Sequence, residues 1–281
     1  MSERRGRTPP IFHASPSISH GSGERLAGGV AWNLTPSPDR PARTVRFPKN
    51  RILGELFTEP YPSSGCGVSQ MRRLGLARGE VRVPADHRLV LYVEDGISEH
   101  GLKALSRLGP RDLQSLLLRG CEITDSSLEH LSGMTWLEHL DVSCNYITGE
   151  GLAHLGGMVL LERLDVWGCD LTEAGLAHLP SLPSLRELTL FLNLELADGG
   201  IAHLDRLPAL ERLDLHGTPI GDSALARLKN MRKLRYLNVS YTKISRNAAL
   251  ELCTALPCCE ISWQPTSAWQ ERGGPPSPAM S

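Results

Sequence analysis

Residues 161–182, LERLDVWGCDLTEAGLAHLPSL, bring together Asp165, Cys169 and His178, three side chain types that take part in catalysis and in metal binding. A carboxylate and an imidazole can transfer protons as general base and general acid. Cysteine, histidine and aspartate are also common ligands of zinc. Whether the stretch is an active site, a metal site or part of a scaffold depends on the elements that carry these residues.

The stretch is one copy of a repeat. LEHLDVSCNYITGEGLAHLGGM begins 24 residues earlier, at Leu137, and LQSLLLRGCEITDSSLEHLSGM begins 24 residues before that, at Leu113. Six full copies place apolar residues at the same three positions of the spacing LxxLxL: Leu113, Leu116 and Leu118; Leu137, Leu140 and Val142; Leu161, Leu164 and Val166; Leu185, Leu188 and Leu190; Leu210, Leu213 and Leu215; Leu234, Leu237 and Val239. A degenerate copy at 89–105 precedes them, and a closing strand around CCEISW follows.

Each copy predicts a strand followed by a helix. In LxxLxL the alternate apolar side chains point the same way, as in a strand with one buried face. The next segment, such as ITDSSLEHL, begins with Thr124 and Asp125, which are good helix N-cap residues, and places Leu128 and Leu131 on one helical face. Such a unit cannot bury its apolar side alone, but stacked neighbours can. We therefore predict an α/β solenoid with a curved parallel sheet on its concave face and helices on its convex face.

The phrases LRGCEITDSSLEHL, VWGCDLTEAGLAHL and LHGTPIGDSALARL resemble the leucine-rich repeat family. They are similar to its 24-residue, cysteine-containing subclass, and the phrase GLAHL is also similar to the GALA-type bacterial repeats. Proteins of this family generally bind other proteins through the concave sheet. The resemblance thus implies a leucine-rich repeat solenoid with a protein partner, whose identity it does not give.

The chain divides into four segments. Residues 1–44 are rich in Pro, Ser and Gly, and the first 50 residues hold eight Arg or Lys against three Asp or Glu, so we expect a disordered basic tail. Residues 45–86 contain short alternating runs that predict a β-rich N-terminal cap, including two strands joined through residues 84–86. Residues 87–264 form the predicted solenoid. Residues 265–281 are again rich in Pro, Gly and Ser, which predicts a second disordered tail.

Composition argues against several classes of protein. The sequence has no uncharged apolar run of about 18 residues, so we expect no transmembrane helix and no membrane partner. The first residues lack the apolar stretch of a secretory signal, and the seven cysteines form no CxxC pair, so we expect a cytoplasmic protein with reduced thiols. The scattered arginines near the start, without interleaved aromatic residues, do not indicate a nucleic-acid partner.

The repeat assigns Cys169 and His178 to scaffold positions. Cys169 belongs to a row of small side chains in the turn after each strand, with Cys121, Asn145, Asn193, Thr218 and Thr242. Such side chains pack or form hydrogen bonds beneath the turn. His178 belongs to a row with His130, His154 and His203, which stacking would place about 5 Å apart. Repetition alone produces such a ladder, and no carboxylate or cysteine stands at a fixed partner position, so we expect no metal and no cofactor.

Asp165 aligns with Asp141 and Asp214 in the middle of the strand face that we expect to be open to solvent. Asp141 and Asp165 fall on adjacent strands, about 5 Å apart, which is close enough for each to change the ionisation of the other. Paired carboxylates can serve as acid and base. Basic side chains two positions earlier on the same face offer them neutralising partners: His139, Arg163 and Arg212. Because an open sheet does not exclude water, we predict that the protein is not an enzyme.

Trp167 does not fit the scaffold. Leu164 and Val166 fill the interior positions of its strand, so alternation turns Trp167 outward onto the concave face. Phe191 and His216 occupy the equivalent positions of the next two copies, and the Phe191 copy carries one extra residue in its loop. Exposed aromatic residues flanked by charge are typical of a binding hot spot, unless a tail or neighbouring loop covers them. The candidate partner-binding residues are Trp167, Phe191, His216, Arg163, Asp165, Asp141 and Arg212.

These observations predict a non-catalytic intracellular protein-protein interaction module that binds a protein on its concave sheet face. The alternative is a substrate receptor or adaptor in a pathway of the ubiquitin-ligase type. Some proteins of the subclass that the repeats resemble carry an F-box before their repeats, and an F-box is helical. Residues 45–86 predict strands instead, so they do not resemble an F-box.

Overall fold

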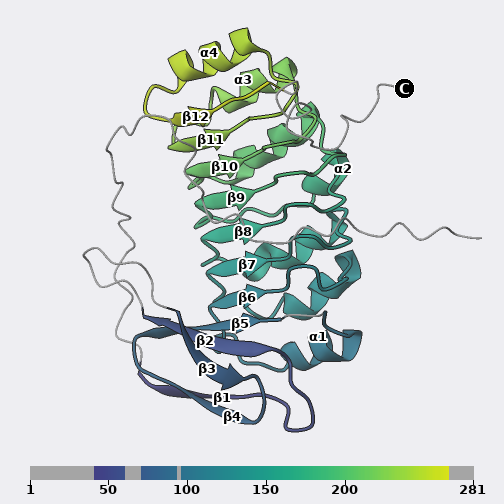
Figure 1. Cartoon of the computed structure of the whole chain (residues 1–281), viewed down its shortest axis with the longest axis vertical. Coiled ribbons are helices and arrows are strands. Elements are labelled where there is room, and N and C mark those ends of the chain that lie inside the picture. Colours follow the sequence, from purple (N-terminus) through teal and green to yellow (C-terminus); the bar gives the residue numbers. More distant parts are fainter. Residues whose placement is uncertain (1–40, 61–70, 94–95, 266–281) are drawn as a thin grey trace, which may run out of the picture.

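Eight parallel strands dominate the structure, a computed structural model that describes residues 41–60, 71–93 and 96–265. Figure 1 shows these strands stacked in chain order, with the helices along one side of the stack. The arrangement confirms the predicted α/β leucine-rich repeat solenoid. The two expected tails lie almost entirely outside the described residues, as does Cys66.

The solenoid strands pair in parallel, each with the next along the chain. Their bounds are β5 His87–Tyr92, β6 Ser115–Leu117, β7 His139–Asp141, β8 Arg163–Asp165, β9 Glu187–Thr189, β10 Arg212–Asp214, β11 Tyr236–Asn238 and β12 Glu260–Ser262. The central residues stand opposite one another, so that Leu140 pairs with Leu116 on one side and with Leu164 on the other. All three of these leucines are 0% exposed, which confirms that the spacing LxxLxL defines the buried face.

The helical segments of the described residues are short, and half of them are 3-10 helices rather than α-helices. Their bounds are α1 Glu99–Leu105, η1 Asp125–Leu131, η2 Glu150–Gly157, α2 Glu173–Leu176, η3 Asp198–Arg206, η4 Asp222–Ala224, α3 Leu225–Leu228 and α4 Arg246–Ala255, where η marks a 3-10 helix. Neighbouring strands lie about 4.8 Å apart, whereas packed α-helices need about 8–10 Å. Narrower and more extended 3-10 segments reduce this mismatch between the two sides of the stack.

Asp125 connects one repeat to the next. The sequence predicts it as an N-cap candidate for its own helix, but its carboxylate accepts hydrogen bonds from N–H groups of the following repeat. The donors are Thr148 at 2.9 Å, Gly149 at 3.0 Å and Gly151 at 2.8 Å. These are N–H groups at the start of η2, which no residue of that helix itself can satisfy. The cap therefore fixes the stacking of neighbouring repeats.

Gly175 lies where two repeats approach each other closely. A Cβ atom at this position would lie 1.8 Å from the Thr148 carbonyl oxygen. Only glycine allows the start of α2 to come this close to the segment before η2.

In residues 41–60 and 71–86, four strands precede the solenoid: β1 Arg43–Arg46, β2 Glu55–Pro60, β3 Arg72–Leu76 and β4 Glu80–Val83. β2 pairs antiparallel with β5 and with β3, which extends the solenoid sheet at its first repeat, while β1 and β4 form a separate two-stranded sheet (Figure 1). Val45 and Leu56 are both 0% exposed within the same core as the repeats. β1 begins two residues before the expected start of the cap at residue 45, and the capping role of 45–86 stays a prediction.

Candidate binding surface on the sheet face

The sheet face, defined as the side of the parallel strands turned away from the helices, carries the predicted binding residues. Leu164 and Val166 point into the core and are 0% and 1% exposed. Arg163, Asp165 and Trp167 alternate with them and therefore point to the sheet face. Because every strand repeats this pattern in register, equivalent side chains form rows that run across the strands.

Asp165 is the centre of an ionic cluster, and its exposure was predicted wrongly. The residue is 3% exposed, although the sequence places it on a face open to solvent. Its Oδ2 atom lies 2.9 Å from His139 Nε2 and 2.7 Å from Arg163 Nε. The two basic side chains anticipated as neutralising partners cover the carboxylate, because one lies on the adjacent strand and the other two positions earlier on the same strand.

The cluster holds Asp165 ionised. Burial works to raise the pKa of this carboxyl, but the hydrogen bond from His139 and the charge and hydrogen bond of Arg163 outweigh it and lower the pKa to about 2. A carboxylate with this pKa does not carry a proton near neutral pH, so it cannot act as a general acid there. Its role is to hold His139 and Arg163 in place on the sheet face.

The cluster continues across the sheet through alternating charges. Arg163 Nη1 lies 3.6 Å from Glu187 Oε2, and Arg212 Nε lies 4.0 Å from Glu187 Oε1. The Arg212 guanidinium also stacks over the Tyr236 ring at 4.3 Å, a cation–π arrangement. The Arg163 and Arg212 side chains are 50% and 37% exposed, so both guanidinium groups remain accessible to a partner.

Of the other two predicted aspartates, only Asp141 lies on a strand next to that of Asp165. Asp141 stands opposite Asp165 in the register, whereas Thr189 separates Asp165 from Asp214. The Oδ1 atoms of Asp141 and Asp214 each accept the backbone N–H two residues further on, both at 2.9 Å. Burial raises the pKa of Asp214, although the His216 N–H and a nearby hydrogen bond from Asn238 favour its ionised form. Both carboxylates therefore shape the turns that follow their strands.

The aromatic side chains form a continuous row, which we call the ring ladder: Trp167, Phe191, His216 and Tyr241. Successive ring centroids are 5.4, 4.8 and 4.9 Å apart, and the interplanar angles rise from 38° to 68° and 81°. Such tilted and edge-to-face contacts are the favourable geometries for aromatic pairs. The Arg119 guanidinium lies 4.2 Å from the Trp167 centroid and extends the ladder at that end.

The rings are half-buried rather than fully exposed. The sequence expectation treated Trp167 and Phe191 as freely exposed, but each ring covers part of its neighbour on the next strand. Burial lowers the pKa of His216 to about 4, so its imidazole is neutral near pH 7 and packs as an aromatic ring. The ladder is thus an uncharged strip beside the ionic cluster.

Tyr241 is the member of the ladder that the sequence reading missed. The repeat aligns Ser240, not Tyr241, with His216. Tyr241 occupies a left-handed turn position with φ of 59°, which Gly217 occupies in the preceding repeat with φ of 66°. Three other copies have glycine at this position, Gly120, Gly168 and Gly217. A tyrosine in their place is the signal that could have identified it, because a bulky residue at positive φ is uncommon.

The row of small side chains has the structural role that the sequence predicts. Asn145 Nδ2 donates to the carbonyl of Leu118 at 2.8 Å, and Cys169 Sγ donates to the carbonyl of Val142 at 3.5 Å. Thr218 and Thr242 donate instead within their own repeats, to the carbonyls of Leu215 and Val239. Burial raises the pKa of the Cys169 thiol to about 12, which leaves it protonated and unreactive.

The histidine row lies on the helical side of the repeats. His154 and His178 are exposed, and His130 and His203 are half-buried. Across residues 41–60, 71–93 and 96–265, no group of three or more His, Cys, Asp or Glu side chains is arranged to hold a metal ion. None of the helices in the described part of the chain combines the length and apolarity that a membrane span requires.

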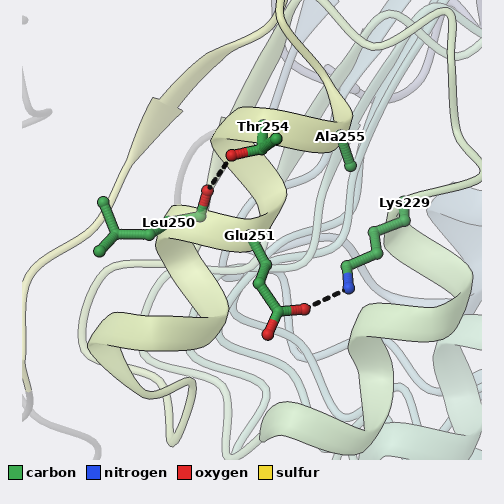
Figure 2. Close-up of a pocket in the computed structure, with 5 residues that line it drawn as sticks. All are labelled: Lys229, Leu250, Glu251, Thr254 and Ala255. Carbon is green, nitrogen blue, oxygen red and sulfur yellow. Dashed lines mark hydrogen bonds and ion pairs between the residues drawn. The ribbon is translucent and has the colours of Figure 1, made fainter.

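A separate hollow lies on the helical side, between α3 and α4. Its lining residues are Lys229, Leu250, Glu251, Thr254 and Ala255 (Figure 2). Lys229 and Glu251 face each other across it as an ion pair. The hollow contains none of the predicted binding residues.

Comparison with known proteins supports the repeat assignment. The family described as Leucine Rich repeat matches residues 133–156, about one repeat. No curated protein matches the chain. With the repeated architecture, the match supports a leucine-rich repeat family. Membership of the 24-residue, cysteine-containing or GALA-type subclass stays a prediction.

Two solved bacterial structures are similar to the chain. One is an internalin of Listeria monocytogenes, with 23% identity and a TM-score of 0.49 over 63% of this chain and 48% of that one. The other is a leucine-rich repeat protein of Leptospira interrogans, with 20% identity and a TM-score of 0.41 over 59% of this chain and 40% of that one. The chain thus spans less than half the length of either structure.

Proposed function

We propose that this chain is a non-catalytic intracellular module that binds a protein partner through the sheet face, with the ring ladder at the centre of the contact. The ladder is the observation that carries the proposal. It places four half-buried rings side by side across four repeats, next to the accessible guanidinium groups of Arg163 and Arg212. Aromatic and arginine side chains are the residues most enriched in interface hot spots.

The predicted binding residues divide into two roles under this proposal. Trp167, Phe191 and His216 contact the partner directly through their exposed ring surface. Asp165 is too buried for such contact and acts by positioning Arg163 and His139. Asp141 lies beside this cluster on the adjacent strand β7, and Arg212 lies two strands away on β10.

The ubiquitin-ligase alternative receives no support from the described residues before the solenoid. Residues 41–60 and 71–86 contain β1 to β4 and no helix, whereas an F-box is helical. We therefore do not propose a ligase role.

Affinity capture with the full chain tests the proposed function. Phe191→Ala removes a central ring of the ladder and should weaken capture of a specific protein about thirtyfold, the equivalent of about 2 kcal/mol. Trp136→Ala is the matched control, because Trp136 is also half-buried beneath an arginine, with Arg111 at 4.4 Å, but is not part of the ladder. Capture that survives Phe191→Ala, or is lost equally with Trp136→Ala, would contradict the proposal. Recovery of ligase subunits would favour the alternative.

A further inference from the structure

We propose that residues 266–281 fold back along the ring ladder and occupy it within the same chain, so that this segment competes with the protein partner. The proposal rests on the proposed function only for the existence of that partner. Three observations support the idea that residues 266–281 cover the ladder: the point where the chain leaves the described structure, the length of the ladder and the residue types of the segment.

The chain leaves the described structure beside one end of the ladder. The Tyr241 backbone N–H donates to the Gln264 carbonyl at 2.8 Å, and the Tyr241 hydroxyl donates to Gln264 Oε1. Gln264 and Pro265 are exposed, and Pro265 is the last described residue. The described chain therefore ends one residue after a hydrogen-bond partner of Tyr241, at one end of the ladder.

The segment is long enough to cover the whole ladder. From Tyr241 to Trp167 the successive ring centroids are 4.9, 4.8 and 5.4 Å apart. An extended chain advances about 3.3 Å per residue, so about five residues span this distance. Residues 266–281 number sixteen, which leaves enough chain for a reversal onto the sheet face.

The residue types of the segment suit a row of rings. Its sequence, TSAWQERGGPPSPAMS, includes Trp269 and three prolines, Pro275, Pro276 and Pro278. An indole ring can stack on the exposed ring surfaces of the ladder. Proline-rich chain packs against aromatic side chains at a small entropic cost, because its backbone is already restricted.

Residues 1–40 also contain prolines and Trp32, but their attachment point is less suitable. They join the described structure just before β1, which lies at the opposite end of the stack from β12 (Figure 1). Trp32 therefore provides a matched control for Trp269.

Fluorine NMR of the full chain labelled with 5-fluorotryptophan tests the proposal. The Trp167 resonance is assigned by Trp167→Phe. Trp269→Ala should shift the Trp167 resonance by well more than its line width, because a neighbouring ring current is lost, while Trp32→Ala should leave it in place. The Trp136 and Trp263 resonances report whether each variant is folded. A synthetic peptide of residues 266–281, added to the Trp269→Ala chain, should return the Trp167 resonance toward its original position.

A Trp167 resonance that is unchanged by Trp269→Ala would overturn the proposal. A larger response to Trp32→Ala would also overturn it, because residues 1–40 would then be the segment that occupies the ladder. A shift that depends on protein concentration would also overturn it, because the occupant would then be a second copy. These outcomes are independent of partner capture, so either proposal can fail alone. If both hold and the segment occupies the ladder about two thirds of the time, Trp269→Ala should tighten partner binding about threefold.

Discussion

Replacing Asp165 with asparagine tests the ionic cluster of the sheet face. The carboxyl has a pKa of about 2 in the folded protein, against about 3.9 in an unfolded chain. A pKa that is depressed on folding contributes stability that is fully present above the unfolded pKa and is lost as the pH falls through the folded pKa. The difference of about two pKa units corresponds to about 2 to 3 kcal/mol near pH 7.

We expect Asp165→Asn to lower the free energy of unfolding by about 2 to 3 kcal/mol at pH 7, since the variant also leaves Arg163 and His139 without their carboxylate. Urea unfolding followed by circular dichroism at several pH values between 7 and 2.5 measures this. The difference between the two proteins should shrink below about pH 4, because the unfolded chain then binds a proton at this carboxyl while the folded protein does not until about pH 2. Asp170→Asn, at an exposed position of the same repeat, should cost less than about 0.5 kcal/mol. A cost below about 0.5 kcal/mol for Asp165→Asn at pH 7, or one that is constant down to pH 2.5, would refute the reasoning.

Three further predictions concern the scaffold. Gly175→Ala should lower the free energy of unfolding by about 1 to 3 kcal/mol in a thermal or urea melt, because the new Cβ would meet the Thr148 carbonyl at 1.8 Å. Gly156→Ala, where a Cβ would meet only ordinary contacts at 3.7 Å, should be nearly neutral. Leu164→Ala should cost about 2 to 5 kcal/mol, and a loss below about 0.5 kcal/mol would mean that the repeat register is wrong. In the folded protein, Cys169 should resist alkylation at pH 8, since burial raises its pKa to about 12, while the exposed Cys258 reacts; mass spectrometry of the modified peptides checks this.

The repeat made much of the fold predictable. Each copy must bury the same three apolar positions, and only stacking of neighbours does this for Leu140 and Leu164 together. The turn row followed from the same alignment, because Asn145 and Cys169 occupy one position of the repeat and form equivalent hydrogen bonds. The type of helix was not predictable in this way, because it depends on the spacing between repeats rather than on the apolar period of one repeat.

The sequence predicted which residues of the candidate site line up across the strands, but not how deeply each of them is buried. Alternation along β8 places Trp167 and Asp165 on the sheet face, and register brings Phe191 beside Trp167. The burial of Asp165 depends on His139, a residue of the neighbouring strand that reaches over it. Tyr241 joins the ladder from the left-handed turn position after its strand, where a ring contacts His216, and this position lies outside the apolar period.

By itself, the sequence determined the strand positions, the buried leucines and the side of the sheet on which each chemistry-bearing residue stands, because these follow from the periodicity of a chain that must bury its apolar side chains. Only the tertiary structure decided which of those residues are open to a partner. Residues 24 to 26 positions apart become neighbours when the repeats stack, and the exposure of a side chain is set by what those neighbours cover: Asp165 is closed over by His139 and Arg163, while the rings from Trp167 to Tyr241 keep part of their surface exposed.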